Sequence, residues 1–164
     1  MKYTKRILVL VLAFAMIFTL VACAKKPIDY KKFKDVLEDD KFDFDVTKGS
    51  PGKDIDKYYY ASDEDGDYFV TYTLYEDADD AEDEIEDYLD EIKDAKDDDE
   101  FDGKISESGS GKYKKIVVNG EHEDDGDMYM VIIRSNDMLI MAGTQSTKKR
   151  DVAEIDKIVK ALGY

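Results

Sequence analysis

The sequence predicts an α+β fold of two layers, in which an antiparallel sheet of five to six strands packs against three helices in the order α-β-β-β-α-β-β-β-α. Two observations support this prediction. Three stretches place apolar residues every three or four positions, the period of a helix with one buried side. Between them lie short runs rich in aromatic and β-branched residues, some joined by Asp-Gly pairs that favour hairpin turns. Helices with one apolar stripe, packed on one face of an antiparallel sheet, make a two-layer domain.

The first helix is predicted over 28–40, with Asp29 as its N-cap and an apolar stripe of Phe33, Val36 and Leu37. The period then changes to two over 42–47, where apolar and polar residues alternate, which predicts a half-buried strand. A loop follows at 48–52, because Gly, Ser and Pro gather there.

An aromatic hairpin is predicted next, from strands at 57–62 and 67–75 joined at Asp65-Gly66, where the turn requires positive φ. Asp77 or Asp79 then caps a long helix that ends near Lys96. Its apolar residues follow helical spacing closely: Ala78, Ala81, Ile85, Tyr88, Leu89 and Ile92. The segment 97–111 has no period, clustered acids, and Gly and Ser at its end, so we expect a mobile loop between two halves.

The second half opens with a strand over 112–119, and two turn signals follow it. We favour the hairpin turn at Asp125-Gly126 and expect Asn119-Gly120 to be a bulge or kink. The segments 128–134 and 138–143 are apolar on both faces, which predicts two central strands.

The last helix is predicted over 151–162, with Gly163 as its stop and the basic run Lys148-Lys149-Arg150 as a solvated loop before it.

The N-terminus has the form of a secretory signal sequence over 1–22. A basic start with Lys2, Lys5 and Arg6 precedes a 16-residue apolar run from Ile7 to Ala22 that contains one polar residue. A membrane-spanning helix needs about 20 apolar residues, so this run is short for one. The chain's single cysteine, Cys23, follows directly.

Leu20, Val21, Ala22 and Cys23 resemble the bacterial lipobox. The resemblance implies that the Cys23 thiol receives a diacylglyceryl group and that cleavage occurs in front of it. Two acyl chains anchor a protein stably, whereas one is marginal. We therefore expect a lipidated cysteine with a short tether at 23–27, a single acidic domain at 28–164, and a position on the extracytoplasmic face of the cell membrane.

The charge limits the partners of this domain. Without the three basic residues of the leader, 21 basic residues stand against 40 acidic ones, a formal charge of −19. Such a chain repels phosphate, which argues against nucleic acid and against peripheral binding to anionic lipid through basic patches. This charge is compatible with attraction of cations or of a basic partner. The favoured interpretation is that it only keeps a tethered protein soluble.

Calcium binding has weak candidates at the two Asp-Gly turns: Asp63, Asp65, Asp125 and Asp127. Neither turn completes an EF-hand loop, because the closing position is Tyr72 in one alignment and Ile132 in the other. Hairpin turns are the favoured interpretation. We predict no cofactor and no bound metal beyond weak cation attraction.

Catalysis has little support. His122 lies between two glutamates and has no nucleophile at a suitable spacing, so we expect an exposed turn residue. We predict no catalytic residue; an envelope hydrolase that uses carboxylates is the alternative.

A tyrosine-rich binding face is a further hypothesis, formed by Tyr58, Tyr60, Tyr68 and Tyr72 on one side of the aromatic hairpin. Exposed aromatic residues there would bind peptide or glycan, whereas cross-strand pairing under a helix is the favoured structural reason for them.

The layout as a whole resembles small lipoproteins of Gram-positive bacteria. The residues that carry the resemblance are Leu20 to Cys23, the stretch 68–83 (YFVTYTLYEDADDAED), Arg134 to Ile140, and Leu162-Gly163-Tyr164. It implies a location and no activity. We expect a monomeric, non-enzymatic interaction module held to the bilayer through Cys23, with an envelope protein, a peptide or a cell-wall polymer as its partner. A hydrolase and a module that responds weakly to divalent cations are the alternatives.

Overall fold

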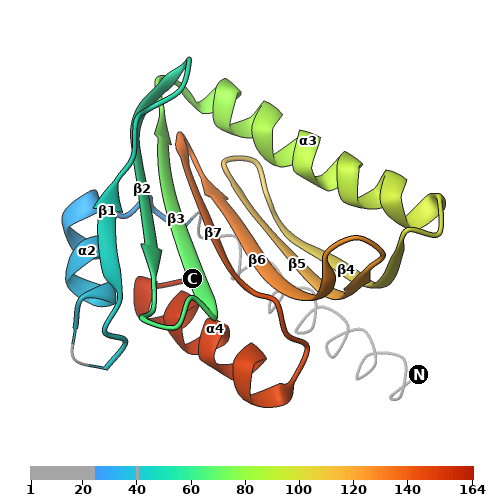
Figure 1. Cartoon of the computed structure of the whole chain (residues 1–164). Helices are drawn as coiled ribbons and strands as arrows, with labels where there is room; N and C mark the ends of the chain where they lie inside the picture. The colour runs from blue at the N-terminus through green and yellow to red at the C-terminus, as the bar shows by residue number, and fades with distance from the viewer. Residues whose placement is uncertain (1–24, 40) are drawn as a thin grey trace, which may run out of the picture.

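Seven antiparallel strands form one sheet in the order β1-β2-β3-β7-β6-β5-β4 (Figure 1). The computed structural model describes residues 25–39 and 41–164. The strands are β1 (Asp45–Lys48), β2 (Ile55–Ser62), β3 (Tyr68–Tyr75), β4 (Phe101–Ser110), β5 (Tyr113–His122), β6 (Gly126–Ser135) and β7 (Met138–Thr144). The helices are α2 (Tyr30–Leu37), α3 (Ala78–Asp97) and α4 (Lys149–Leu162). The predicted order of helices and strands is confirmed, with seven strands in place of five to six.

The additional strand is β4, which occupies most of the segment predicted as the mobile loop 97–111. It pairs with β5 without a register shift, from Phe101 opposite His122 to Ser110 opposite Tyr113. The sequence did not reveal this strand, because β4 is an edge strand and every residue of its second half is exposed. Only Phe101 and Ile105 turn apolar side chains toward the core, so no long alternation appears in the sequence.

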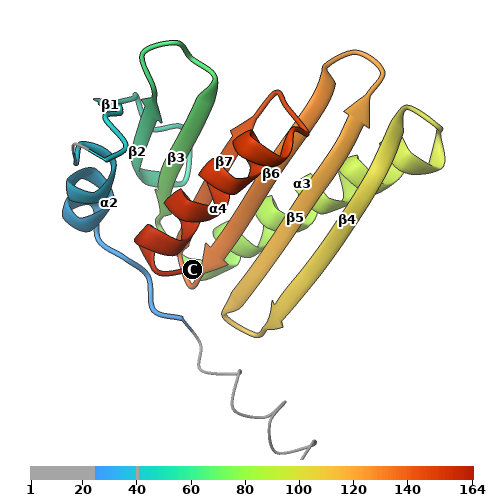
Figure 2. The same cartoon turned by 90° about the horizontal axis from the view of Figure 1, so that it is seen from below.

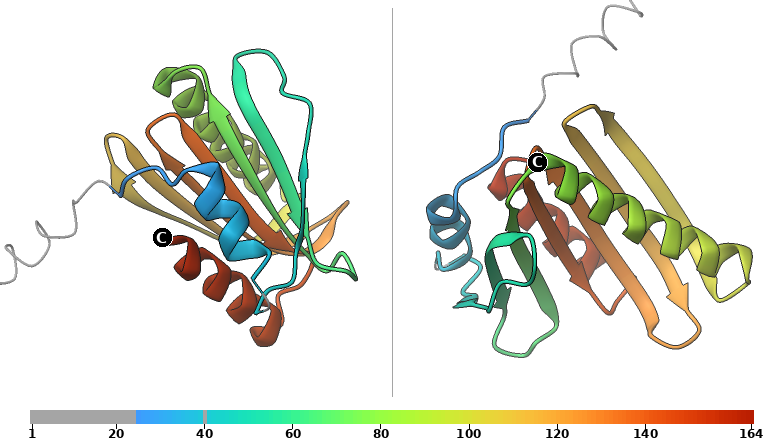
Figure 3. Two further views of the ribbon diagram at one scale, coloured as in Figure 1. Left: turned by 90° about the vertical axis from the view of Figure 1, so that its left-hand side faces the viewer. Right: turned by 90° about the horizontal axis from the view of Figure 1, so that it is seen from above.

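The sheet is the middle of three layers, so the prediction of two layers is wrong. Figure 2 and Figure 3 show α3 on one face of the sheet and α2 with α4 on the other. The reason lies in β6 and β7, which are apolar on both sides. Val131 and Ile133 belong to the core under α2 and α4, whereas Ile132 and Leu139 belong to the core under α3. A sheet that is apolar on both faces requires cover on both.

Glycine conformations define the two hairpins. Gly66 and Gly126 have φ of 75° and 74°, so both Asp-Gly pairs form turns, and the choice of Asp125-Gly126 is confirmed. The bulge expected at Asn119-Gly120 is wrong, because β5 and β6 keep continuous register through Gly120 opposite Met128. Gly120 instead allows close packing, since an added Cβ would lie 2.5 Å from Cα of Gly103 and 2.8 Å from the ring of Phe101.

The helix ends follow the expected chemistry at Asp29, Asp77 and Gly163. Asp29 accepts the backbone N–H of Lys32 at 2.8 Å, and Asp77 accepts those of Asp79 and Asp80 at 2.9 and 3.2 Å. Gly163 ends α4 in the left-handed conformation. The basic run differs from prediction: Lys148 is the N-cap, and Lys149 and Arg150 lie in the first turn of α4.

The segment before α2 packs against the domain. Ser135 Oγ donates to the carbonyl of Lys25, Tyr164 OH donates to that of Lys26 at 2.8 Å, and Tyr72 OH donates to that of Ile28 at 3.1 Å. Lys25 and Lys26 of the predicted tether 23–27 are therefore docked on the domain. Leu20 to Cys23 lie outside the described residues. Within the described part of the chain, no helix has the length and apolar character to cross a membrane.

Candidate interaction surface

The α3 face of the sheet is only partly covered. Figure 1 shows α3 crossing this face on a diagonal, from the end of β3 to the start of β4. It leaves uncovered the hairpin end of β2 and β3 and the C-terminal end of β7. Under the helix, Ile132 and Leu139 are 0% and 2% exposed, whereas Tyr60 is 41% exposed. A sheet face with an apolar composition is therefore open beside the helix.

The strand register identifies the residues of this open surface. Tyr60, Thr71 and Met141 lie side by side on β2, β3 and β7. Phe69, Gly143 and Met130 form the next row. We define the open surface as Tyr60, Phe69, Thr71, Met128, Met130 and Met141, of which all but Tyr60 are half-buried.

Phe69 and the methionines shape this surface. The Phe69 ring lies across Gly143, where a Cβ atom would be 2.7 Å from Cζ of the ring. The ring thereby covers backbone that has no side chain of its own. Methionine side chains have three rotatable bonds and a polarizable sulfur, so they adapt to differently shaped apolar partners. The open surface is therefore better suited to contact with another polypeptide than to tight binding of a small molecule.

Acidic residues of α3 border the open surface. Tyr88 of α3 lies near Tyr58 of β2, and burial together with the neighbouring Glu84 and Glu91 raises the Tyr88 pKa. Further along, α3 and the end of β5 line a groove of about 620 Å³. Its lining residues are Asp87, Asp90, Glu91, Asp94, Ala95, Asp98, Glu100 and His122. An apolar platform thus adjoins a strongly acidic groove.

The predicted tyrosine face does not exist as one surface. Tyr59 is opposite Tyr72 in the register, so Tyr72 and Tyr68 lie on the α2 and α4 side, whereas Tyr58 and Tyr60 lie on the α3 side. Tyr72 is 2% exposed and is part of the core. Adjacent strand residues alternate between faces, so the expected single tyrosine face is wrong: the observed register separates the two pairs of tyrosines.

The weak cation candidates lie at one end of the sheet, on two separate turns. Asp63 accepts the backbone N–H of Tyr68 at 2.9 Å, and Asp127 accepts the hydroxyl of Thr147 at 3.1 Å. These contacts use the carboxylates to hold turns. Across residues 25–39 and 41–164, no group of three or more His, Cys, Asp or Glu side chains is arranged to hold a metal ion.

A polar cavity of about 320 Å³ lies between the hairpin turns and the start of α4. Asp67 and Asp127, the closing residues of the two Asp-Gly-Asp turns, both line it together with Asp151. Asp151 accepts from Ser146 Oγ at 2.7 Å, Arg150 Nε at 2.9 Å and Tyr68 OH at 2.9 Å. These donors, Ser146 first, lower the pKa of Asp151 to about 2. The hydrogen bond between Tyr68 of β3 and Asp151 of α4 connects these two elements.

A charged network joins α3 to the β4–β5 hairpin. Arg134 is 3% exposed and donates to Glu82 at 2.9 Å and to the carbonyl of Gly111 at 2.6 Å. Lys114 pairs with Glu86 at 2.6 Å and with Glu107 at 3.4 Å. Arg134 and the half-buried Lys114 thus each have a carboxylate partner, although Nε of Arg134 is buried without a hydrogen-bond partner. These contacts fix α3 over β5 and β6, in its diagonal orientation across the sheet. In that orientation α3 does not cover the open surface.

The hydrolase alternative requires two close carboxyl groups of which one has a raised pKa. Among the described residues, Asp80 is the carboxyl group whose pKa is clearly raised, by burial and by the neighbouring Asp77 and Asp54. It lies in the first turn of α3. The expectation that His122 is an exposed turn residue is wrong, because it is the last residue of β5 and is half-buried. Its Nδ1 accepts the backbone N–H of Asp124 at 3.3 Å.

The fold and this surface define the chain as an αβα sandwich with an all-antiparallel sheet and one partly open face. Comparison of the chain with protein-family models, with curated proteins and with solved structures finds no match.

Proposed function

We propose that this chain is a membrane-anchored, extracytoplasmic lipoprotein whose domain is a non-enzymatic interaction module. Its occupant is a cationic polypeptide segment that also carries apolar side chains. The observation that supports this function is the open surface, on which Tyr60, Phe69 and three half-buried methionines adjoin the acidic side of α3.

The charge of α3 favours a cationic occupant. The helix carries 11 acidic and two basic residues, a formal charge of −9. Such a helix raises the local concentration of cationic segments and increases their rate of association. Anionic cell-wall polymers are repelled by the same charge, which makes them the weaker choice.

The apolar platform supplies the short-range part of recognition. Aromatic side chains and methionine are enriched in the centres of protein interfaces, where buried apolar area contributes most of the affinity. A segment that alternates basic and apolar residues would place its apolar side chains on Tyr60, Phe69 and Met141. Its basic side chains would then reach the acidic groove beside α3.

Binding of a labelled model peptide to the full-length protein tests this proposal. The probe is a fluorescent peptide of alternating Lys and Leu, with a Glu and Leu peptide of the same length as its comparison. We expect saturable binding of the cationic peptide only, weakened by salt because exposed charges are screened. Equal binding of both peptides, or no binding of either, would contradict the proposal.

Two substitutions localise the binding. Tyr60→Ala and Met141→Ala each remove an apolar contact of the open surface, and we expect affinity to fall about fivefold or more for each. Val117→Ala is the matched control, because Val117 is also a half-buried residue of the sheet but lies opposite Val131, on the α4 side. An equal effect of the control variant would place the binding elsewhere.

The anchor is tested separately, by labelling cells with a clickable fatty acid. We expect label on the wild-type chain and none on Cys23→Ala. An unlabelled wild type, or a labelled Cys23→Ala variant, would refute lipidation at this position.

A further inference from the structure

The N-terminal segment leaves the domain at a defined place. Lys25 and Lys26 are held through their carbonyls by Ser135 and Tyr164. Lys25 Nζ also lies 5.6 Å from the centre of the Tyr164 ring. Lys25 is two positions after Cys23, with Ala24 between them. Two extended peptide units span at most about 7 Å. A lipid on Cys23 would therefore act on a fixed corner of the domain.

This corner belongs to the α2 and α4 side of the sheet. Ser135 is opposite Tyr113 on β5 and Met138 on β7, and Met138 is part of the core under α2 and α4. Tyr113 and Tyr164 stack with their ring centres 6.2 Å apart. Figure 2 shows the β4–β5 hairpin, the C-terminus and the chain entering α2 at the same end of the sheet, opposite the acidic hairpin turns.

The two sides of the molecule differ in charge. On one side, α2 carries three lysines and one aspartate, and α4 carries four basic and three acidic residues. On the other side, α3 has a formal charge of −9. The helices of this side are thus net positive within their bounds, although Asp29, Glu38 and Asp39 at the ends of α2 offset part of that excess. An anionic membrane would repel this side far less than it repels α3.

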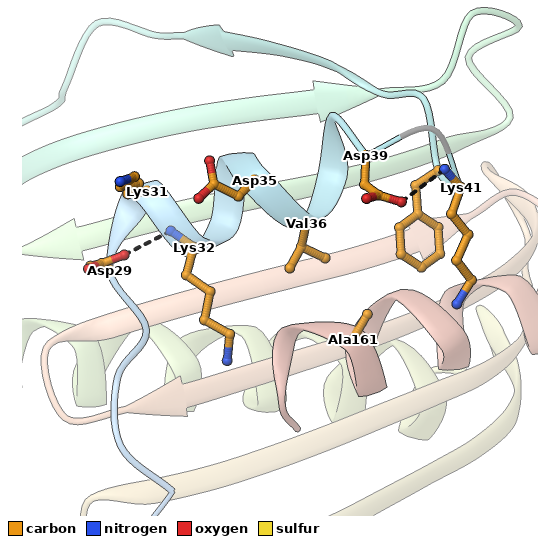
Figure 4. Close-up of a pocket in the computed structure, with 9 residues that line it drawn as sticks. Asp29, Lys31, Lys32, Asp35, Val36, Asp39, Lys41 and Ala161 are labelled. Carbon is orange, nitrogen blue, oxygen red and sulfur yellow. Dashed lines mark hydrogen bonds between the residues drawn. The ribbon is translucent and has the colours of Figure 1, made fainter.

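The groove between α2 and α4 is lined by three lysines, Lys31, Lys32 and Lys41, and by three aspartates, Asp29, Asp35 and Asp39. This groove has a volume of about 500 Å³, and the side chains of Lys32 and Lys41 extend from the α2 region toward α4 (Figure 4). Lys32 Nζ caps α4 by donating to the carbonyl of Leu162 at 2.9 Å. Lys112 is exposed beside the docked segment, where its carbonyl accepts from the backbone of Asn136 at 2.7 Å.

We propose that the domain lies on an anionic bilayer in one orientation, with the α2 and α4 side and the Tyr113–Tyr164 corner toward the lipid headgroups and with α3 and the open surface directed away. The inference rests on the proposed membrane anchor. Attraction of each lysine to an anionic surface is additive at close range, and tyrosine is favoured at the headgroup level. Repulsion of α3 by the same surface selects the same orientation. The open surface then faces the space from which a partner arrives.

The test uses the full-length lipidated protein in vesicles of phosphatidylglycerol and phosphatidylcholine that contain a headgroup-nitroxide lipid. Lipidation occupies the Cys23 thiol, so a fluorophore can be attached to one new cysteine. Lys112→Cys reports on the docked corner, and Asp83→Cys reports on the exposed side of α3. We expect strong quenching at position 112 and weak quenching at position 83. Replacing phosphatidylglycerol by phosphatidylcholine should reduce the difference.

Charge variants test the cause of the orientation. Lys31→Glu combined with Lys157→Glu reverses charge on the lipid-facing side, and we expect the quenching at 112 to fall while the protein still floats with the vesicles. Lys93→Glu makes the same kind of change on α3 and should leave the quenching unchanged. Equal quenching at 112 and 83 in floating protein would overturn the orientation alone. Loss of flotation in the unmodified protein would overturn the anchor and the orientation together.

Discussion

Asp151 shows how one carboxylate can join three elements. It connects α4 to β3 through Tyr68 and to the preceding loop through Ser146, and it is 6% exposed. It also places a negative charge in the first turn of α4, which compensates Lys149 and Arg150 at the positive end of the helix dipole. A basic run at a helix start is tolerated here because of this single acid.

The stability of the protein should depend on pH through Asp151. Its pKa is about 2 in the folded chain against the ordinary value of 3.8, so the unfolded chain takes up the proton first as the pH falls. The contribution of Asp151 is complete above about pH 4 and is lost as the pH approaches 2. Urea unfolding of the wild type and of Asp151→Asn between pH 6 and pH 2 would measure it. We expect the difference in unfolding free energy to shrink below about pH 4; a difference that stays constant would exclude this titration.

Gly120 is required by packing. An added Cβ would collide with the carbonyl of Asp102 and would lie 2.5 Å from Cα of Gly103, both on the neighbouring strand β4. Gly120→Ala should lower the free energy of unfolding by about 1–3 kcal/mol, the usual cost of overpacking. Gly52→Ala is the control, because its Cβ would make an ordinary contact of 3.5 Å with Ile55 and should change stability by less than about 0.5 kcal/mol. Chemical denaturation checks both, and equal effects would contradict the packing argument.

At the scale of elements, β4 is the strand most open to direct test. Every residue from Phe101 to Ser110 has a partner on β5. Those of its amides that face β5 should exchange with solvent at least about tenfold more slowly than loop amides at 51–54, because exchange requires the pairing to open. Hydrogen exchange measured by mass spectrometry distinguishes a paired strand from the mobile loop that the composition suggests. Exchange at the loop rate throughout 101–110 would contradict the pairing.

The elements that the sequence predicted well are those whose local pattern and tertiary role agree. The stripe of α3 is buried at Ala81, Ile85 and Leu89, as its spacing indicates, and Asp77 caps the helix. β6 and β7 were recognised as central strands from their apolar character on both faces. The same feature implies helices on both sides of the sheet, a consequence that the two-layer prediction did not include.

The candidate surface was less predictable, because it depends on register and on the diagonal of α3. Composition indicated an aromatic hairpin but could not show that Tyr58 and Tyr60 lie on the opposite side from Tyr68 and Tyr72. From the sequence alone, Met128, Met130 and Met141 are indistinguishable from ordinary core residues. They become a surface only because α3 follows the charged network around Arg134 and does not cover them.

At the scale of the whole molecule, charge is arranged by face. The acids that give the chain its net charge concentrate on α3 and on the hairpin turns, while α2 and α4 carry a small positive excess. This arrangement gives the acidity two proposed uses, attraction of a cationic segment and orientation on a membrane. It also has a cost, since like charges along one helix repel each other and destabilise the folded state.

That repulsion should respond to any mobile ion, whereas a specific calcium site would respond to Ca²⁺ above other ions. Salt should raise the melting temperature of the full-length protein, because mobile ions screen the repulsion along α3. Ca²⁺ and Mg²⁺ at about 1 mM, the range of weak extracellular sites, should raise it equally, because screening depends on charge and not on ionic size. A built calcium site would prefer the larger ion, since Mg²⁺ demands near-octahedral geometry and releases its water reluctantly. Differential scanning fluorimetry with both ions therefore decides the question. A shift for Ca²⁺ that exceeds the Mg²⁺ shift by several degrees, and that disappears in Asp125→Asn or Asp127→Asn, would establish a cation site at the hairpin turns and refute screening as the sole effect.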